Sequence, residues 1–226
     1  MCLMNRPAQT ASGAQSKPQQ SLTGFVLAGG KSSRMGKGRD KAFLDLAGQT
    51  LLERAITLLQ SVAEEVLVVG EVTKFMNLTR SIEDIYPAQG PLGGIHAALR
   101  RTSTPLNLIL AVDLPFVEPA FLAYLASEAS RSGAMVTAPR TTEGWQPLCA
   151  VYHRDFADVA EPFLKVGRNK IDSLFSPAET RAIGKEELER TGFSETMFRN
   201  LNTPEEFARA EKELREAEEA STSRNS

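Results

Sequence analysis

The chain has 226 residues, a formal net charge of −2, 42% apolar and 24% charged side chains. This length suits one well-packed domain, and the near-neutral charge argues against a general attraction to nucleic acid or to anionic membranes. The two cysteines, Cys2 and Cys149, are far apart, as are His96 and His153, so a disulfide framework and a zinc site are both disfavoured. A cytoplasmic protein is expected.

Residues 1–22 are rich in Ser, Gln, Ala and Pro and contain no continuous apolar stretch of the kind found in signal peptides. We expect a disordered N-terminal extension there. No segment reaches the roughly 20 apolar residues that span a bilayer. Residues 23–219 are predicted to form a single domain, and residues 220–226 a flexible tail.

Buried strands and helices alternate in the first half of the chain. The apolar runs GFVLAGG at 24–30 and EVLVVGE at 65–71 are typical of buried parallel strands. Between them, a capping-box pattern and apolar residues at helical spacing predict a helix over 50–62. A turn-rich loop at 81–94 precedes another helix, and NLILAVDLP at 107–115 is the most apolar strand.

The second half continues with a helix predicted at 118–130 and two strands at 134–140 and 146–154, which the segment TTEGW can join as a hairpin. Short helical stretches are expected at 156–166 and 169–175. The alternation predicts an α/β fold with three α/β/α layers, a Rossmann-like and mostly parallel sheet with one antiparallel strand, and ligands outside the carboxyl ends of its strands.

The final helix carries several local signals. Thr203 is the expected N-cap, Pro204 occupies the first helical position, and Glu206 completes a capping box. We therefore predict that the helix begins directly after the motif NLNT.

The segment LAGGKSSRMGKGRDK at 27–41 combines four glycines with five basic side chains. Glycines let backbone N–H groups approach a polyanion, while Arg34 can offer a bidentate fork and Lys41 a point charge. The segment contains neither the P-loop pattern nor G-x-G-x-x-G, which argues against a P-loop ATPase and a dinucleotide dehydrogenase. A nucleoside triphosphate site is the hypothesis, and a tight turn with solvated charges is the structural alternative.

This segment, continued to Arg54, resembles the N-terminal signature of the MobA-like nucleotidyltransferases, whose pattern runs LAGG, Ser, Arg-Met-Gly, Asp-Lys, Leu, Gly, Leu. One or two extra residues stand between Gly36 and Asp40. The resemblance continues in order through IEDIYPAQGPLGG, ILAVDLPFV, WQPLCAVY and NLNTPEEF, and covers residues 22 to about 214.

Within this family, the sequence is most similar to the guanylyltransferases that transfer GMP from GTP to Mo-molybdopterin, forming a guanine dinucleotide cofactor and pyrophosphate. The resemblance implies GTP and Mo-molybdopterin as substrates, Mg²⁺ as cofactor, and transient contacts with molybdenum-insertion and molybdoenzyme-maturation proteins. Related cytidylyltransferases and sugar-phosphate enzymes usually carry alanine at the position of Gly29, so this glycine favours GTP. Gly70 stands where the guanylyltransferases often place asparagine, which counts against GTP.

Asp113 follows the strand NLILAV directly, so a parallel sheet places it at the carboxyl edge beside the glycine loop. The resemblance implies that Asp113 is the Mg²⁺ ligand. It also implies that Asp113, Arg34 and Lys41 are catalytic residues. The alternative for Asp113 is an aspartate that forms a turn or caps a helix. The resemblance also assigns nucleotide binding to Asp84, whose alternative is a plain loop acid. Asp40 is expected to orient the loop. The assigned nucleotide-binding backbone comprises Leu27, Ala28, Gly29 and Gly30.

No Ser, Cys or His nucleophile is expected, because the acceptor phosphate can itself attack the α-phosphorus. Cys149 is predicted to be a core thiol. For the acceptor, the resemblance points to the segments containing Gln146, Asn200 and Asn202, together with Trp145 and Arg154. Trp145 as a cap on the core and Asn202 as a support for the helix turn are the alternatives.

Two rival functions remain open from the sequence. One is a cytidylyltransferase or sugar-phosphate nucleotidyltransferase that uses the same loop on another acceptor. The other is a non-catalytic nucleotide-binding module, against which the presence of both Lys41 and Asp113 counts.

Overall fold

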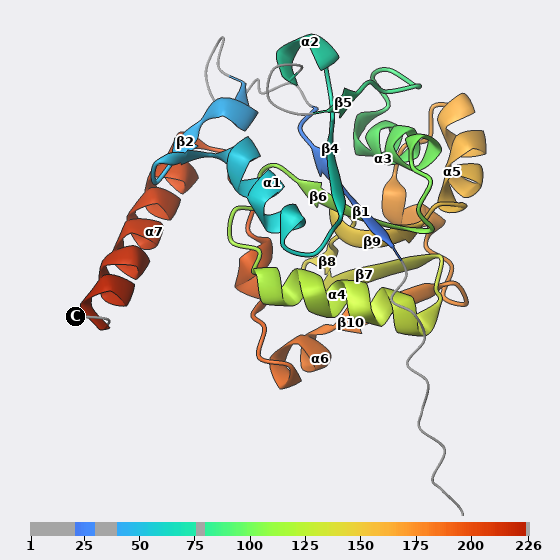
Figure 1. Cartoon of the computed structure of the whole chain (residues 1–226). Helices are drawn as coiled ribbons and strands as arrows, with labels where there is room; N and C mark the ends of the chain where they lie inside the picture. The colour runs from blue at the N-terminus through green and yellow to red at the C-terminus, as the bar shows by residue number, and fades with distance from the viewer. Residues whose placement is uncertain (1–20, 30–39, 76–79, 225–226) are drawn as a thin grey trace, which may run out of the picture.

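The computed structural model describes residues 21–29, 40–75 and 80–224. Its central sheet has the strand order β10-β7-β9-β6-β1-β4-β5, with β8 paired to β7 (Figure 1). The strands of this sheet are β1 (Leu22–Leu27), β4 (Glu65–Val69), β5 (Ser81–Ile82), β6 (Leu106–Ala111), β7 (Val136–Thr141), β8 (Gly144–Trp145), β9 (Cys149–His153) and β10 (Thr180–Gly184). A separate small pair comprises β2 (Asp45–Leu46) and β3 (Gln49–Thr50).

The strands are joined by α-helices and by three short 3-10 helices. The α-helices are α1 (Leu51–Gln60), α2 (Val72–Phe75), α3 (Gly90–Arg101), α4 (Pro119–Ser132), α5 (Phe156–Lys165), α6 (Lys185–Arg190) and α7 (Pro204–Arg224). The 3-10 helices are η1 (Lys41–Phe43), η2 (Ile171–Leu174) and η3 (Glu195–Phe198).

The central sheet is mostly parallel, as predicted. Strand β1 runs parallel to β4 and β6, β4 to β5, and β7 to β10. Strand β9 is inserted between β6 and β7 and runs antiparallel to both. The hairpin through β8 reverses the chain after β7. The antiparallel strand expected from the hairpin signal is therefore confirmed.

Helices cover both faces of this sheet. In β1, Val26 packs into one apolar cluster with α1 and α4, while Phe25 and Leu27 pack into a second cluster with α3 and α5. All three side chains are buried because a central parallel strand has no solvent-facing side. The three-layer α/β/α arrangement follows, and α7 extends away from it (Figure 1).

The two capping boxes predicted from the sequence are both present. The Thr50 hydroxyl accepts the Glu53 N–H, and the Glu53 carboxylate accepts the Thr50 N–H. Thr203 and Glu206 make the same reciprocal pair at the start of α7. Both helices thus begin where local hydrogen bonding satisfies amides that have no intrahelical partner.

Several element boundaries differ from the expectation. Strand β1 begins at Leu22, inside the stretch expected to be an extension, because this side chain is buried. Helix α7 continues to Arg224, past the expected start of the tail. Strand β10 was not predicted, because TRAIG is only half-buried at the sheet edge and carries little apolar signal.

Candidate active site

The carboxyl ends of the central strands meet along one edge of the sheet. The Ala28 N–H donates to Val69 O at 3.0 Å, and the Val112 N–H donates to Leu27 O at 3.2 Å. These bonds align the first residue after β1 with the end of β4, and the first residue after β6 with the end of β1. Because parallel strands bring their loops to a shared edge, the predicted nucleotide-binding residues Leu27, Ala28 and Gly29 lie beside the loop that carries Asp113.

Gly29 and Gly70 approach each other closely at this edge. A Cβ on Gly29 would lie 3.9 Å from Gly70 Cα. A Cβ on Gly70 would lie 2.8 Å from Cε2 of Phe75 and 3.5 Å from the Gly29 nitrogen. Only glycine fits at position 70 while the buried Phe75 ring keeps its place. An asparagine at position 70 would therefore require the Phe75 ring to move.

Lys41 and Asp113 form an ion pair at the carboxyl end of β6, with 2.9 Å between Nζ and Oδ2. The Lys41 side chain is 14% exposed and the Asp113 side chain 23%, so water screens the attraction between their charges only in part. Lys41 begins η1, whose N-cap Asp40 accepts the Ala42 N–H at 3.1 Å. Asp40 also pairs with Lys74 at 3.3 Å, so its carboxylate contacts η1 and α2 rather than Asp113.

Asn202 joins this pair from the other end of the chain. Lys41 Nζ donates to Asn202 Oδ1 at 3.1 Å, and the Leu201 N–H donates to the backbone oxygen of Asp113 at 3.2 Å. From the sequence, Asn202 was assigned to the acceptor, and its contact with the lysine was not expected. The motif NLNTPEE marked this segment as a candidate for the site. It could not indicate a partner that lies 161 positions earlier in the sequence.

Asp84 lies half-buried beside the first turn of α3. Its Oδ1 is 3.5 Å from the place that a Cβ on Gly94 would occupy, and its Oδ2 is 3.8 Å from that of Gly93. Burial raises the pKa of Asp84 above its ordinary value. The N-cap residue of α3, Gln89, makes no side-chain capping bond. The carboxylate and the helix N-terminus thus present polar groups next to the end of β4.

The antiparallel direction of β9 decides which acceptor candidates reach this edge. The Ala111 N–H donates to Leu148 O at 2.8 Å, which places the loop before β9, including Gln146, next to the end of β6. Arg154 follows the other end of β9, where its N–H donates to Pro105 O. Arg154 was therefore wrong as an acceptor candidate, because it lies where β6 begins.

The remaining acceptor candidates differ in how firmly they are held. Gln146 Nε2 donates to Thr141 Oγ1 at 3.1 Å. Trp145 packs edge-on against Phe175 with 5.1 Å between ring centroids, which fits the alternative of a core cap. Asn200 is exposed. Thr142, in the loop after β7, donates its N–H and its hydroxyl to Glu195 of η3. These two hydrogen bonds connect the segment that contains Gln146 to the segment that contains Asn200 and Asn202.

The groups predicted to be unreactive are in the core or away from this edge. Cys149 is fully buried, which raises the pKa of its thiol. His96 is 1% exposed, and burial lowers the pKa of its imidazole. His153 lies at the end of β9 beside Asp155. Gly30 and Arg34, predicted to bind phosphate, lie outside the described residues.

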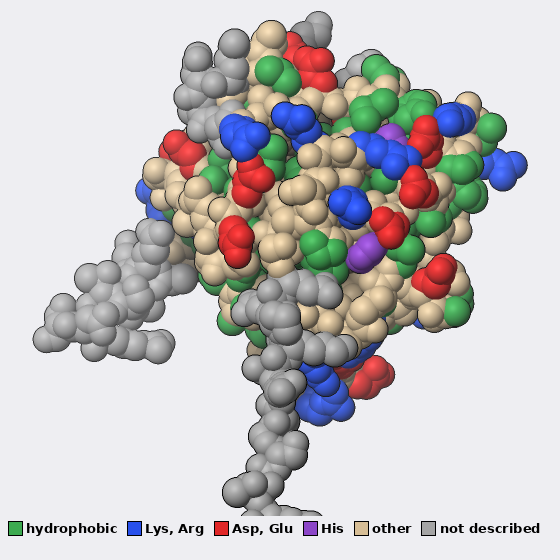
Figure 2. Space-filling view, turned by 45° about the vertical axis from the view of Figure 1, so that its right-hand side comes forward, with side chains coloured by type: hydrophobic (Ala, Val, Ile, Leu, Met, Phe, Trp, Pro, Cys, Tyr) green, Lys and Arg blue, Asp and Glu red, His purple; other side chains and the backbone are tan. Residues whose placement is uncertain are grey.

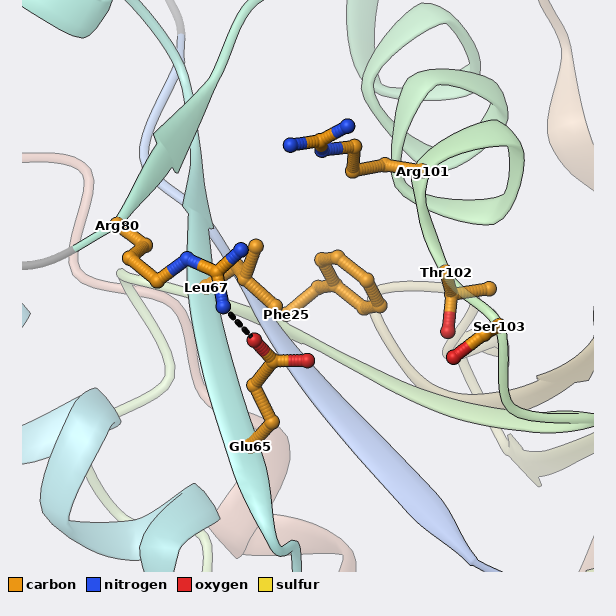
Figure 3. A pocket seen from close by; sticks show the side chains of 7 residues that line it. All are labelled: Phe25, Glu65, Leu67, Arg80, Arg101, Thr102 and Ser103. Carbon is orange, nitrogen blue, oxygen red and sulfur yellow. Dashed lines mark hydrogen bonds and ion pairs between the residues drawn. The ribbon is translucent and has the colours of Figure 1, made fainter.

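A hollow at the opposite edge of the sheet is a poor candidate for the nucleotide (Figure 3). An ion pair between Arg80 and Glu65 crosses part of it, so one of its two arginines is already neutralised. It is lined by Phe25, Glu65, Leu67, Arg80, Arg101, Thr102 and Ser103. Glu65 begins β4 and Ser103 precedes β6, whereas open α/β sheets bind ligands at the carboxyl ends.

Charged side chains on the surface are mixed in sign. Figure 2 shows Lys and Arg interspersed with Asp and Glu on the side that it presents. On that side there is no broad basic face of the kind that nucleic-acid binding uses. Within the described residues, no helix is long and apolar enough to cross a membrane.

Residues 24–180 match the MobA-like NTP transferase domain. The chain belongs to the MobA-like NTP transferase family. A relative from Desulfosudis oleivorans, named molybdenum cofactor guanylyltransferase, is 32% identical over 192 residues, covering 84% of this chain and 94% of the relative. The resemblance found in the motifs is confirmed.

Solved structures agree with this membership. The MobA-like chain is similar to molybdopterin-guanine dinucleotide biosynthesis protein A from Archaeoglobus fulgidus, with a TM-score of 0.74 and 27% identity over 86% of this chain and 99% of that one. The 2-C-methyl-D-erythritol 4-phosphate cytidylyltransferase from Thermus thermophilus has a TM-score of 0.61 and 17% identity, covering 84% and 98%. The fold is therefore shared with a cytidylyltransferase and does not select the base.

Proposed function

We propose that this protein transfers GMP from GTP to Mo-molybdopterin, producing the guanine dinucleotide form of the cofactor and pyrophosphate. The observation that carries the proposal is the Lys41–Asp113 pair, held at the carboxyl edge of the sheet beside the end of β1. Relatives named molybdenum cofactor guanylyltransferase match most of the chain and supply the substrate class.

The chemistry requires charge neutralisation more than an activated side chain. A triphosphate carries about four negative charges, and the attacking phosphate adds more, so cationic groups must reduce the repulsion before in-line attack. Lys41 provides an ammonium at this edge, and Arg34 is proposed to provide a second cation. The acceptor phosphate is already an anion and attacks without a protein nucleophile, consistent with the burial of Cys149 and His96.

Asp113 is the proposed holder of Mg²⁺. Its Oδ2 accepts from Lys41, and among the described residues none donates a hydrogen bond to Oδ1. No group of three His, Cys, Asp or Glu side chains gathers there within the described part of the chain. This suits Mg²⁺, which proteins commonly bind through one or two carboxylates together with substrate phosphates. When bound, Mg²⁺ neutralises phosphate charge as a Lewis acid.

The nucleotide would lie along the ends of β1 and β4. The backbone of Leu27, Ala28 and Gly29, continued by Gly30, is proposed to approach the phosphates, and Asp84 to contact the base or the water shell of the metal. The acceptor would lie toward Gln146, Asn200 and Asn202, on the other side of Asp113. This order places the α-phosphorus next to the Lys41–Asp113 pair.

The proposal places the reaction in the cytoplasm. Because the product is a cofactor used by other proteins, it includes transient contacts with molybdenum-insertion and molybdoenzyme-maturation proteins. Two alternatives are a cytidylyltransferase or sugar-phosphate nucleotidyltransferase, which shares the fold and which the absence of asparagine at position 70 leaves open, and a non-catalytic nucleotide-binding module.

The test is pyrophosphate release by the purified chain with Mg²⁺ and molybdate-loaded molybdopterin, measured in parallel with GTP, CTP, ATP and UTP. Release with GTP is expected, and it should stop when EDTA removes the metal. Faster release with CTP would support the cytidylyltransferase. Binding of GTP without release from any nucleotide would support the binding module.

A further inference from the structure

The capping box of α7 reaches beyond the helix that it caps. Glu206 Oε2 accepts the Thr203 N–H at 3.0 Å, which is the usual capping bond, and also the Asn202 N–H at 2.6 Å. In the α1 box, by comparison, Glu53 accepts the N–H and hydroxyl of the N-cap Thr50. The Glu206 carboxylate thus binds the residue before the N-cap, which the helix itself does not require.

The residue held in this way is the one that contacts Lys41. Asn202 Oδ1 accepts from Lys41 Nζ, while the neighbouring Leu201 is buried and its N–H donates to Asp113 O. The segment 201–203 is therefore fixed at three points: to Asp113, to Lys41 and to Glu206. The pKa of Glu206 lies below its usual range, first because of the Asn202 N–H and in part because of the charge of Lys41.

A lysine ammonium needs such support. Its four-carbon side chain has many rotamers, and ordering it costs conformational entropy. Asp113 Oδ2 accepts one hydrogen bond from Lys41 Nζ, and Asn202 Oδ1 accepts a second. Two acceptors restrict the position of the ammonium more than one does. Since Asn202 is exposed and precedes the helix, its backbone needs its own restraint, which the Glu206 carboxylate provides.

We infer that Glu206 is a positioning residue, which fixes Asn202 so that its amide oxygen holds the Lys41 ammonium beside Asp113. The inference rests on the proposed function, because Lys41 is the group that would meet the phosphates. Glu206 acts through Asn202 and does not itself touch a substrate.

The first experiment compares kcat and KM of full-length Glu206→Ala, Glu206→Gln and Glu53→Ala. Glu206→Ala should lower kcat about tenfold, the scale of losing a group that orients a catalytic residue, with little change in KM for GTP. Glu206→Gln should stay within about threefold of wild type, because both N–H groups donate to one oxygen, which the glutamine carbonyl replaces.

Glu53→Ala is the matched control. It removes the equivalent carboxylate from the α1 capping box, where Glu53 bonds the N-cap Thr50 and not Asn202, and should destabilise the protein by a similar amount without lowering kcat. Equal losses of kcat in Glu53→Ala and Glu206→Ala, or an unchanged kcat in Glu206→Ala, would overturn the inference, since helix capping alone would then explain the result.

A double variant tests the route through Asn202. If Glu206 acts by fixing Asn202, Glu206→Ala combined with Asn202→Ala should have the kcat of Asn202→Ala alone. Multiplying losses would overturn the inference.

Crystal structures of Glu206→Ala and Glu206→Gln give a readout that does not depend on turnover. The alanine variant should lose the contact between Lys41 Nζ and Asn202 Oδ1, and the glutamine variant should keep it. If wild type released no pyrophosphate, the proposed function would fail, whereas these structures would still decide whether Glu206 positions Asn202. Retention of the contact in Glu206→Ala would overturn the inference.

Discussion

Lys41 Nζ lies 2.9 Å from Asp113 Oδ2, although 72 positions separate the two residues in the sequence. The lysine comes from the first turn of η1, and the aspartate follows the end of β6. Both side chains are mostly shielded from water, so removing either one leaves a partly desolvated charge with less compensation. The pair therefore behaves as one unit.

Asp113→Ala and Lys41→Ala should each reduce turnover by at least ~100-fold, the scale of losing an electrostatic contact to a transition state. Steady-state pyrophosphate release measures this effect, and circular dichroism checks that the fold is retained. Asp155→Ala is the control, because this exposed carboxylate lies after β9 at the opposite edge. Near wild-type turnover in both active-site variants would remove the proposed mechanism.

Asp84 predicts a pH-dependent stability effect. Burial raises its pKa above the ordinary value of 3.8, so its protonated form favours the folded state and its ionised form disfavours it. The stabilising contribution is full below about pH 3.8 and is lost as pH rises through the raised pKa. Asp84→Asn, which stays neutral, should therefore stabilise the apo protein at higher pH and change little below that range.

Urea unfolding of wild type and Asp84→Asn across this pH range measures the difference. The same variant should raise KM for GTP roughly tenfold, because a neutral amide with one acceptor oxygen replaces a charged carboxylate with two. Glu83→Gln changes an exposed neighbour and is the control. A constant stability difference at every pH would show that ionisation of Asp84 is not its cause.

Gly29→Ala tests the choice of nucleotide. A Cβ at this position would meet Gly70 Cα at 3.9 Å and Val69 O at 4.0 Å, so the methyl group fits without strain. The unfolding midpoint should stay unchanged. The ratio of kcat/KM for GTP to kcat/KM for CTP should fall roughly tenfold, which is the effect of adding about one methylene group to a binding pocket. An unchanged ratio would mean that this glycine does not select the base.

Gly93→Ala and Gly94→Ala form a matched pair in α3. A Cβ on Gly93 would lie 3.0 Å from the backbone oxygen of Tyr86, which cannot rotate away, whereas a Cβ on Gly94 would meet its nearest neighbours at 3.4 Å. Alanine is favoured over glycine in a helix by about 1 kcal/mol, and the clash at Gly93 opposes that gain. In urea unfolding, Gly94→Ala should be more stable than Gly93→Ala by about 1 kcal/mol or more. Equal midpoints would show that the Tyr86 loop moves freely.

Elements with strong local signals were predictable from the sequence. The capping boxes at Thr50 and Thr203 and the apolar runs of β1 and β6 encode their structure within a few neighbouring residues. The position of Asp113 at a carboxyl edge also followed, because a buried strand that ends in an acid leaves few other arrangements in a parallel sheet. The ordered motifs predicted the family, which the comparisons confirmed.

Contacts between distant segments required the tertiary structure. That Gln146 reaches the edge while Arg154 does not depends on the direction of β9, which pairing with β6 and β7 decides. The half-buried strand β10 is fixed by its partner β7 rather than by its own composition. Asn202 meets Lys41 only because the chain returns across Asp113 before α7. The local elements and the residue types of the site could be read from the amino-acid order, since these depend on near neighbours. Tertiary packing alone decided which of those residues share one edge, because long-range strand order and direction bring them together.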